Sequence, residues 1–353
     1  MGQTLENEMR SEGEVRKLQE TGRASFIVSV PKKWVQDLGL RKGSLIRVLA
    51  QQDGSLLMTA RETTTRQKPT EVTVEIEPSL DPHSLARKLI ALYLIGMNTI
   101  VLKSTGSRMS ADLRDTVREL VRTKLVGTEI VSESSTEMGL QVLLSYPELS
   151  AESALRRMVT IAGQMHRDSI TALCEDKHDL AAQVLKSDDE VDRFGFYIVR
   201  LLKQAVEDPR LMKEIGLDSS RACLGRRLIT KSVERIADHS ARIAEHATEL
   251  QKALTPRLVG RMKELSDFVS LQFQEASQAL FESDYLMADR VLARQDRADA
   301  LGSEIEKQIY KQNLSPEDIA GLRLILESLK RIGEYGNDIA EIVLNLTVST
   351  SKK

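Results

Sequence analysis

The stretch ITKSVERIADHSARIAEHATEL, residues 229–250, decides the fold together with its counterpart ILESLKRIGEYGNDIAEIVLNL, residues 325–346. In each stretch apolar residues recur at alternating spacings of four and three, which predicts a long helix with one buried face. A stripe with this spacing favours near-antiparallel packing of helices in a left-handed bundle. Ser240 and Gly336 occupy matching places in the two stripes, where a small side chain lets a neighbouring backbone approach.

Both stretches belong to a unit that occurs twice in the chain. Residues 184–195 align with residues 291–302, and the aspartates at 189 and 192 match those at 296 and 299. Helical periodicity begins near Ser150, and Ser219 and Ser315 have the character of helix starts. The expected helices are 151–175, 178–208, 217–252, 256–283, 285–313 and 316–347. Residues 151–347 are therefore predicted to form tandem three-helix bundles, 151–252 and 256–347.

In residues 71–146 sequence patterns typical of strands and of helices alternate, which predicts a small α/β domain. Strands are expected at 72–76, 99–102, 129–131 and 140–144, and helices at 82–95 and 111–123. The segment contains no glycine-rich phosphate loop and no cluster of catalytic side chains. The sequence gives no role to this domain.

The first domain, residues 13–61, is predicted from short β-rich runs around one helical turn. The runs are 14–20, 25–30, 45–49 and 56–58, the short helix opens at Pro31, and Gly39 closes it. So small a unit buries too little surface to be stable alone, so we expect a second copy to complete it in a homodimer or a higher homo-oligomer. Residues 62–70 are polar and are predicted to be a linker.

Composition and charge narrow the class of protein. Residues 1–68 hold 12 Lys and Arg against 8 Asp and Glu, a net +4, while the rest of the chain carries −6. A basic first domain on an acidic body fits an anion-binding head. The apolar stretch Leu89–Met97 is far shorter than the ~20 residues of a membrane span, so no membrane insertion is expected. The polar start and two isolated cysteines, Cys174 and Cys223, indicate a cytoplasmic protein with reduced thiols.

Two parts of the chain resemble known families. The run from Val15 to Gly22, the segment FIVSVPKKW at 26–34 and the segment GLRKGS at 39–44 resemble the SpoVT/AbrB swapped-hairpin domain. The segment ERIADH at 234–239, within the tandem bundles, resembles the repeats of PhoU, the phosphate-uptake regulator. This resemblance implies a dimeric swapped-hairpin β-barrel that binds DNA, followed by a helical domain that takes part in the control of phosphate uptake.

The first domain offers a set of DNA-binding candidates. They are Arg16, Lys17, Arg23, Lys32 and Lys33. A swapped-hairpin barrel presents positive charge from its first strand, first turn and short helix, and phosphate contacts of this kind give affinity. The alternative is that they are ordinary solvated charges on a dimerisation module.

The helical region offers a set of carboxylate candidates. Glu234 and Asp238 lie four residues apart on one helix face, where like charges repel unless a cation sits between them. The resemblance to PhoU implies metal binding by such carboxylates, and oxygen ligands suit Mg, Mn or Fe. The full candidate set is Glu234, Asp238, Asp189, Asp192, Asp296, Asp299, Glu334 and Asp338.

An interpretation of these carboxylates without a metal ion also stays open, as does metal ligation by two histidines. The carboxylates could instead pair with Arg235, Arg242 and Arg193 on a solvated face. In the second repeat Lys330 replaces the first glutamate, and its ammonium would compete with a metal ion.

His239 and His246 share one helix face and could ligate a metal, although histidines that pack in bundles are commoner.

The leading hypothesis is a non-enzymatic, dimeric DNA-binding transcription regulator of phosphate homeostasis with a PhoU-like sensor domain. The alternative is a PhoU-like adaptor that acts on a phosphate transporter or its signalling partner, with the head serving only for dimerisation. A metal-dependent phosphatase is the weak enzymatic hypothesis, because nothing resembles an activated nucleophile.

Overall fold

The computed structural model describes residues 14–21, 25–50, 54–60, 70–77, 79–106, 108–143, 149–251 and 254–348. The chain divides into two compact units, Met1–Lys68 and Pro69–Lys353. We call the described residues between 14 and 60 the head. Two of the three regions predicted from the sequence, the α/β region and the helical region, together form the second unit.

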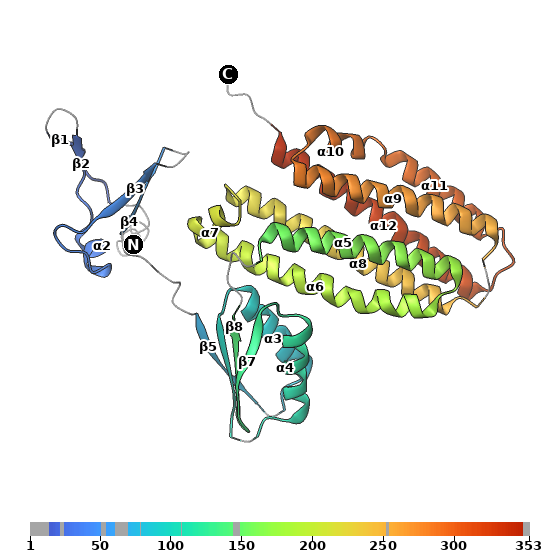
Figure 1. Cartoon of the computed structure of the whole chain (residues 1–353), viewed down its shortest axis with the longest axis horizontal. Helices are drawn as coiled ribbons and strands as arrows, with labels where there is room; N and C mark the ends of the chain where they lie inside the picture. The colour runs from blue at the N-terminus through green and yellow to red at the C-terminus, as the bar shows by residue number, and fades with distance from the viewer. Residues whose placement is uncertain are drawn as a thin grey trace, which may run out of the picture. The chain divides into compact units, whose positions relative to one another are not determined.

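The head contains two short hairpins and one short helix (Figure 1). Its elements are β1 (Gln19–Thr21), β2 (Ser25–Ile27), α2 (Lys32–Asp37), β3 (Ile46–Ala50) and β4 (Leu56–Ala60). β1 pairs with β2 and β3 pairs with β4, in two separate antiparallel sheets. The first predicted strand is shorter than expected, because residues 14–18 lie outside β1.

The described residues of a single chain form no closed barrel. Among residues 14–21, 25–50 and 54–59 no side chain is buried. Val15, Phe26 and Leu56 are each more than half exposed. The physical reason is size, since two ladders this short cannot cover each other's apolar faces. The barrel predicted from the sequence is therefore absent from the described part of one chain.

The α/β region is a four-stranded sheet with two helices. Its elements are β5 (Glu71–Ile76), α3 (Pro82–Leu94), β6 (Thr99–Ser104), α4 (Ala111–Thr123), β7 (Thr128–Glu133) and β8 (Glu137–Val142). The strand order is β5-β6-β8-β7, with β5 and β6 parallel and the other pairs antiparallel. The side chains of Asp81 and Ser110 cap the two helices by accepting backbone hydrogen bonds. All six elements predicted here are present, with bounds that differ by a few residues.

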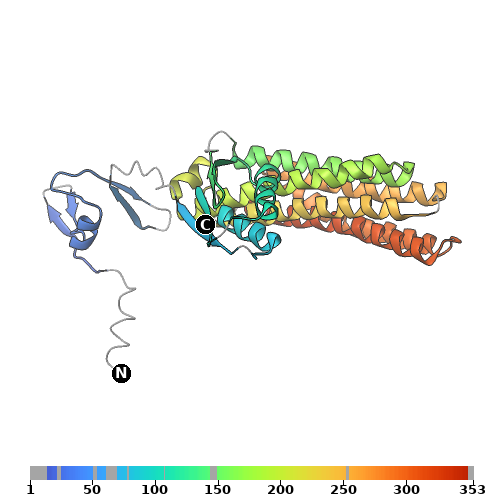
Figure 2. The same ribbon diagram turned by 90° about the horizontal axis from the view of Figure 1, so that it is seen from below.

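The helical region consists of long helices that run side by side (Figures 1 and 2). Its first half contains α5 (Ala151–Glu175), α6 (His178–Glu207), α7 (Pro209–Glu214) and α8 (Ser220–Glu249). Its second half contains α9 (Pro256–Glu282), α10 (Tyr285–Leu292), α11 (Gln295–Ile309) and α12 (Pro316–Thr347). In the part of the chain that the structure describes, no helix combines the length and apolarity needed to cross a membrane.

The sequence prediction differs from the structure at two helices. The continuous helix expected at 285–313 is wrong, because the chain breaks between α10 and α11 at Ala293 and Arg294. Asp296 in the first turn of α11 favours a new helix start there, since an acidic side chain suits the positive end of the helix dipole. The short helix α7, which begins at Pro209, was not predicted.

The two halves repeat their turns as well as their helices. α5 and α9 both end in a residue in the left-handed region, Asp176 at φ 54° and Ser283 at φ 56°. Ser240 is fully buried, and a Cβ at Gly336 would lie 3.5 Å from the backbone nitrogen of Phe273. The close backbone approach predicted for the small residues is confirmed at Gly336.

The α/β region packs on the first half of the helical region. Helices α3 and α4 both contact α6. Phe196 of α6 packs against the core of the α/β region, and Val126 from the loop after α4 is buried in the core of the helical region. This shared apolar packing explains why the two predicted regions form one compact unit.

Candidate functional site

The four carboxylates predicted in the first repeat come from two neighbouring helices. Asp189 and Asp192 lie on α6, while Glu234 and Asp238 lie on α8. Burial raises the pKa of Asp238, and the nearby charge of Asp192 raises it further. In the structure the charge of the α6 carboxylate Asp192 therefore acts on the α8 carboxylate Asp238. We call Asp188, Asp189, Asp192 and Asp238 the carboxylate cluster.

Asp188 is the member of this cluster that sequence analysis missed. Burial raises the pKa of its carboxyl to about 6, with further contributions from Asp192 and Asp238. The residue did not stand out because the internal repeat matches only Asp189 and Asp192. Its spacing of four from Asp192 was nevertheless a usable signal, since residues four apart share a helix face.

Lysine side chains already pair with these carboxylates. The Nζ of Lys124 lies 2.6 Å from Oδ1 of Asp189 and 2.7 Å from Oδ2 of Asp192. The Nζ of Lys231 lies 2.5 Å from Oε1 of Glu234. The sequence interpretation named Arg235, Arg242 and Arg193 as the cations. The direct ion pairs are made by these two lysines, while the charges of Arg242 and Arg235 act on Asp238. Lys124 comes from the α/β region, which sequence analysis did not connect with the cluster.

The side chains as placed do not fit a metal ion. Among the described residues, no three His, Cys, Asp or Glu side chains are arranged as a set that could hold one. The oxygens of Asp189 and Asp192 that a metal would use face the ammonium of Lys124 instead. Metal binding by Mg, Mn or Fe at this cluster stays a prediction from the family resemblance.

The candidates of the second repeat do not form an equivalent cluster. Asp296 and Asp299 are exposed on α11. Glu334 pairs with Arg331, with 2.7 Å between Oε2 and Nη1. Burial raises the pKa of Asp338, and Glu341 and Glu334 raise it further. Lys330, which stands where the first repeat has its glutamate, lies with its methylene groups against Gly302.

The two histidines of α8 lie in different surroundings. The ring of His239 lies 5.7 Å from the ring of Tyr335, and burial lowers its pKa to about 4. Nδ1 of His246 lies 2.9 Å from Oε2 of Glu249 on the same helix. Each histidine is therefore engaged in helix packing or a local ion pair.

The basic candidates of the head are spread over three places. Arg16 pairs with Glu14, and Lys17 is exposed next to it. Lys32 and Lys33 are exposed in the first turn of α2. Arg23 lies outside the described residues. One of the four described cations is thus neutralised within the head, and the three lysines face solvent.

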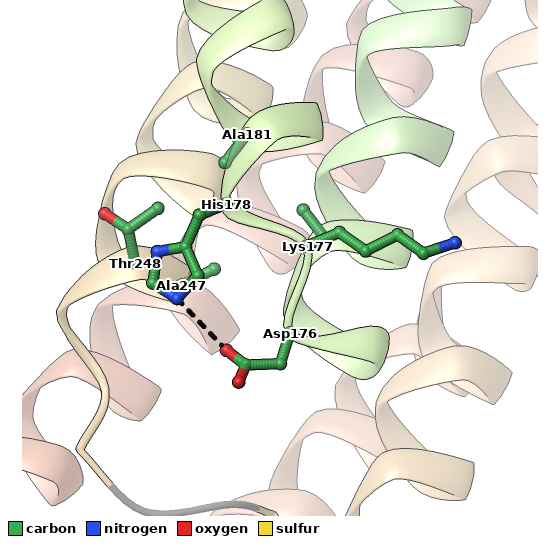
Figure 3. Close-up of a pocket in the computed structure, with 7 residues that line it drawn as sticks. Asp176, Lys177, His178, Ala181, Ala247 and Thr248 are labelled. Atoms are coloured by element: carbon green, nitrogen blue, oxygen red, sulfur yellow. Dashed lines mark ion pairs between the residues drawn. The ribbon is translucent and has the colours of Figure 1, made fainter.

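The end of the first bundle carries a small depression (Figure 3). It is lined by Ala172, Asp176, Lys177, His178, Ala181, Ala247 and Thr248. Oδ1 of Asp176 lies 3.3 Å from Nε2 of His178. With about 130 Å³ of empty volume, it is far smaller than the ~300 Å³ at which ligand pockets begin. We assign no ligand to it.

The helical region thus consists of two halves built on an internal repeat, with α5, α6 and α8 as the long helices of the first half and α9, the broken helix α10–α11 and α12 as their counterparts in the second. Residues 155–247 and 262–343 match the family model of the PhoU domain. The chain therefore carries two PhoU domains, one in each half of the helical region. The resemblance seen in the sequence is confirmed for this part of the chain.

Relatives and solved structures agree with this assignment. The Phosphate-specific transport system accessory protein PhoU homolog 1 of Thermotoga maritima is 24% identical over 209 residues, which cover 57% of this chain and 88% of that protein. The PhoU homolog of Pseudomonas putida is 26% identical over 212 residues, or 56% of this chain and 78% of that protein. The crystal structure of PhoU from Pseudomonas aeruginosa is similar at a TM-score of 0.50 and 22% identity, over 56% of this chain and 94% of that one. That likeness shows the fold of the helical region.

Proposed function

We propose that this chain is a non-enzymatic cytoplasmic accessory protein of a phosphate-specific transport system, which acts as an adaptor through its PhoU domains. The observation that carries the proposal is the match of both helical halves to the PhoU domain. The relatives from Thermotoga maritima and Pseudomonas putida bear the name of such accessory proteins. The adaptor hypothesis therefore fits better than the leading hypothesis of a DNA-binding regulator.

Phosphate uptake by cells that lack the chain tests the adaptor role. We expect uptake of radiolabelled phosphate to respond abnormally to external phosphate in the deletion strain, and the full chain to restore the response. The matched control is Gly336→Leu, which disrupts the packing of α12 on α9 because the backbone of Phe273 lies too close for a larger side chain. Normal uptake in the deletion strain at every phosphate concentration would overturn the proposal.

We also propose that the head joins two copies of the chain. Its described side chains include no buried core, while Leu45 and Phe26 are each more than half exposed. A unit this small needs a partner surface to be stable, and the exposed apolar strands supply one. A second copy of the same head is the occupant that the resemblance to swapped-hairpin domains implies.

Sedimentation of the full chain at micromolar concentration tests this role of the head. We expect a dimer or larger assembly, and the double variant Leu45→Asp, Leu56→Asp should shift it to the monomer. The control is Leu324→Asp, which makes the same change at a leucine of α12 that is half exposed and lies outside the head. A monomeric wild-type chain would contradict the proposal.

DNA binding by the head stays a prediction that none of these findings supports. A mobility-shift assay with the DNA upstream of the chain's own gene, in the presence of non-specific competitor, distinguishes the two hypotheses. The adaptor hypothesis expects no specific complex. A specific complex that the triple variant Lys17→Gln, Lys32→Gln, Lys33→Gln loses would restore the regulator hypothesis.

A further inference from the structure

The α/β region docks on the first PhoU domain through the loop that follows α4. Lys124 ends that helix, and its backbone N–H donates to the Leu120 carbonyl at 2.9 Å. Two residues later, Val126 is only 8% exposed and lies in the helical core. The hydroxyl of Tyr93 on α3 donates to the Val126 carbonyl at 3.1 Å. Both helices of the α/β region therefore hold this loop against the bundle.

A buried arginine fixes the same interface from the other side. Arg200 on α6 is 4% exposed, and its guanidinium lies 4.9 Å from the ring of Tyr93. It donates to the carbonyl oxygens of Tyr93 at 2.5 Å and Met97 at 2.9 Å, and to Oδ1 of Asn98 at 2.6 Å. These bonds cross between the two regions, and the guanidinium that makes them is buried, so they set the position of the end of α3 over α6.

The docked loop places the ammonium group of Lys124 at the carboxylate cluster. Lys124 contacts Asp189 and Asp192 directly, and its side chain is 22% exposed. The charge of Lys124 also acts on Asp188, and that of Asp192 acts on Asp238. Lys124 thus offsets the negative charge of Asp188, Asp189 and Asp192, whereas Lys231, Arg242 and Arg235 act on Asp238. Without these cations the mutual repulsion of the carboxylates would be large.

We propose that Lys124 is the resident cation of this cluster, so that the α/β region occupies the place in the first PhoU domain that the family resemblance gives to a metal ion. The same aspartate oxygens cannot hold both an ammonium at 2.6–2.7 Å and a divalent cation. The contact of the Lys124 ammonium with these oxygens and the binding of a divalent cation are therefore mutually exclusive at this cluster. The second PhoU domain has no such lysine, since no ion pair joins Asp296 or Asp299 among the described residues.

Titration of the full chain with MnCl₂ by calorimetry tests this assignment. We expect Lys124→Gln to bind Mn²⁺ about tenfold more tightly than the wild type, which lies within the range typical of coupling between two competing ligands. The matched control is Lys103→Gln, which removes a lysine of the same region that pairs with Glu137 and not with the bundle. The triple variant Lys124→Gln, Asp189→Asn, Asp192→Asn should lose the added affinity.

Hydrogen exchange provides a second readout that does not depend on metal. Lys124→Gln should increase amide exchange at the end of α4 and in residues 125–127, while Lys124→Arg and Lys103→Gln should leave both protected. Arg200 keeps the α/β region attached in all these variants, so they are expected to fold. Equal Mn²⁺ affinity in the wild type and Lys124→Gln, or unchanged exchange in Lys124→Gln, would overturn the proposal.

Discussion

The guanidinium of Arg200 lies over the ring of Tyr93 and donates to the carbonyl oxygen of the same residue, so one side chain of the helical region binds the end of α3 in two ways. Its remaining bonds go to Gly96, Met97 and Asn98, directly after that helix. The carbonyl oxygen of Tyr93 also accepts from the backbone N–H of Gly96 at 3.1 Å, so the turn that ends α3 and the helical region share this acceptor. The α/β region is consequently a fixed part of the second unit.

Arg200→Ala should lower the free energy of unfolding by about 3 kcal/mol, because buried acceptors lose their charged donor. Chemical denaturation followed by circular dichroism measures the change. Lys203→Ala is the control, since Lys203 is exposed three residues further along α6 and its loss should cost less than about 0.5 kcal/mol. An equal effect of the two substitutions would show that the contacts of Arg200 do not stabilise the unit.

Gly96→Ala should destabilise the chain for two reasons. The residue has φ 95°, and an added Cβ would lie 3.0 Å from Nε2 of Gln204. Gly106→Ala is the control, because Gly106 has φ 87° with open space around it and reports the backbone cost alone, about 1 kcal/mol. We expect the larger loss at Gly96, partly relieved by Gln204→Ala in a double-mutant cycle. Equal losses at the two glycines would contradict the steric part of the argument.

His166 should make stability fall in mild acid. It is 1% exposed, Nε2 lies 3.0 Å from Oγ of Ser266, and burial lowers its pKa to about 4. An unfolded histidine has a pKa of about 6.5, so below that pH the unfolded state binds a proton that the folded state does not. The contribution of His166 to the free energy of unfolding is therefore complete above pH 6.5 and is lost as the pH falls toward about 4.

Denaturant titrations between pH 7 and pH 4.5 measure this effect. The slope of the unfolding free energy should be smaller in His166→Gln than in the wild type by about 1.4 kcal/mol per pH unit. Ser266→Ala should lower stability at every pH yet keep the wild-type slope, because the imidazole remains. Identical slopes in the wild type and His166→Gln would contradict the assignment.

Ser283→Gly should stabilise the chain by about 1 kcal/mol, because glycine adopts the left-handed conformation of this helix end without a Cβ penalty. Thermal unfolding measures the gain. Ser303→Gly makes the same chemical change inside α11, where it should instead cost about 1 kcal/mol. A loss of stability at both positions would mean that the conformation of Ser283 is not a source of strain.

Local sequence patterns predicted most of the helical region and the α/β region. The caps at Ser150 and Ser315 mark helix starts that match the expected ones, and apolar spacing set the buried faces. The break after Ala293 escaped prediction because the apolar period continues through it. The sequence did predict that the head buries too little surface by itself, because its elements are few and short, whereas its division into two separate two-stranded sheets could not be read from the pattern of apolar residues.

The sequence by itself determined the tandem helical repeat, its PhoU character and the four acidic positions of the first repeat, because these depend on residue spacing along one helix. Only the tertiary structure decided that Lys124 pairs with two of those carboxylates, Asp189 and Asp192, because that lysine lies 68 residues before Asp192 in another region of the chain. Its place follows from Val126 entering the bundle core and from Arg200 holding the end of α3. Contacts of this kind join residues whose local patterns carry no information about each other.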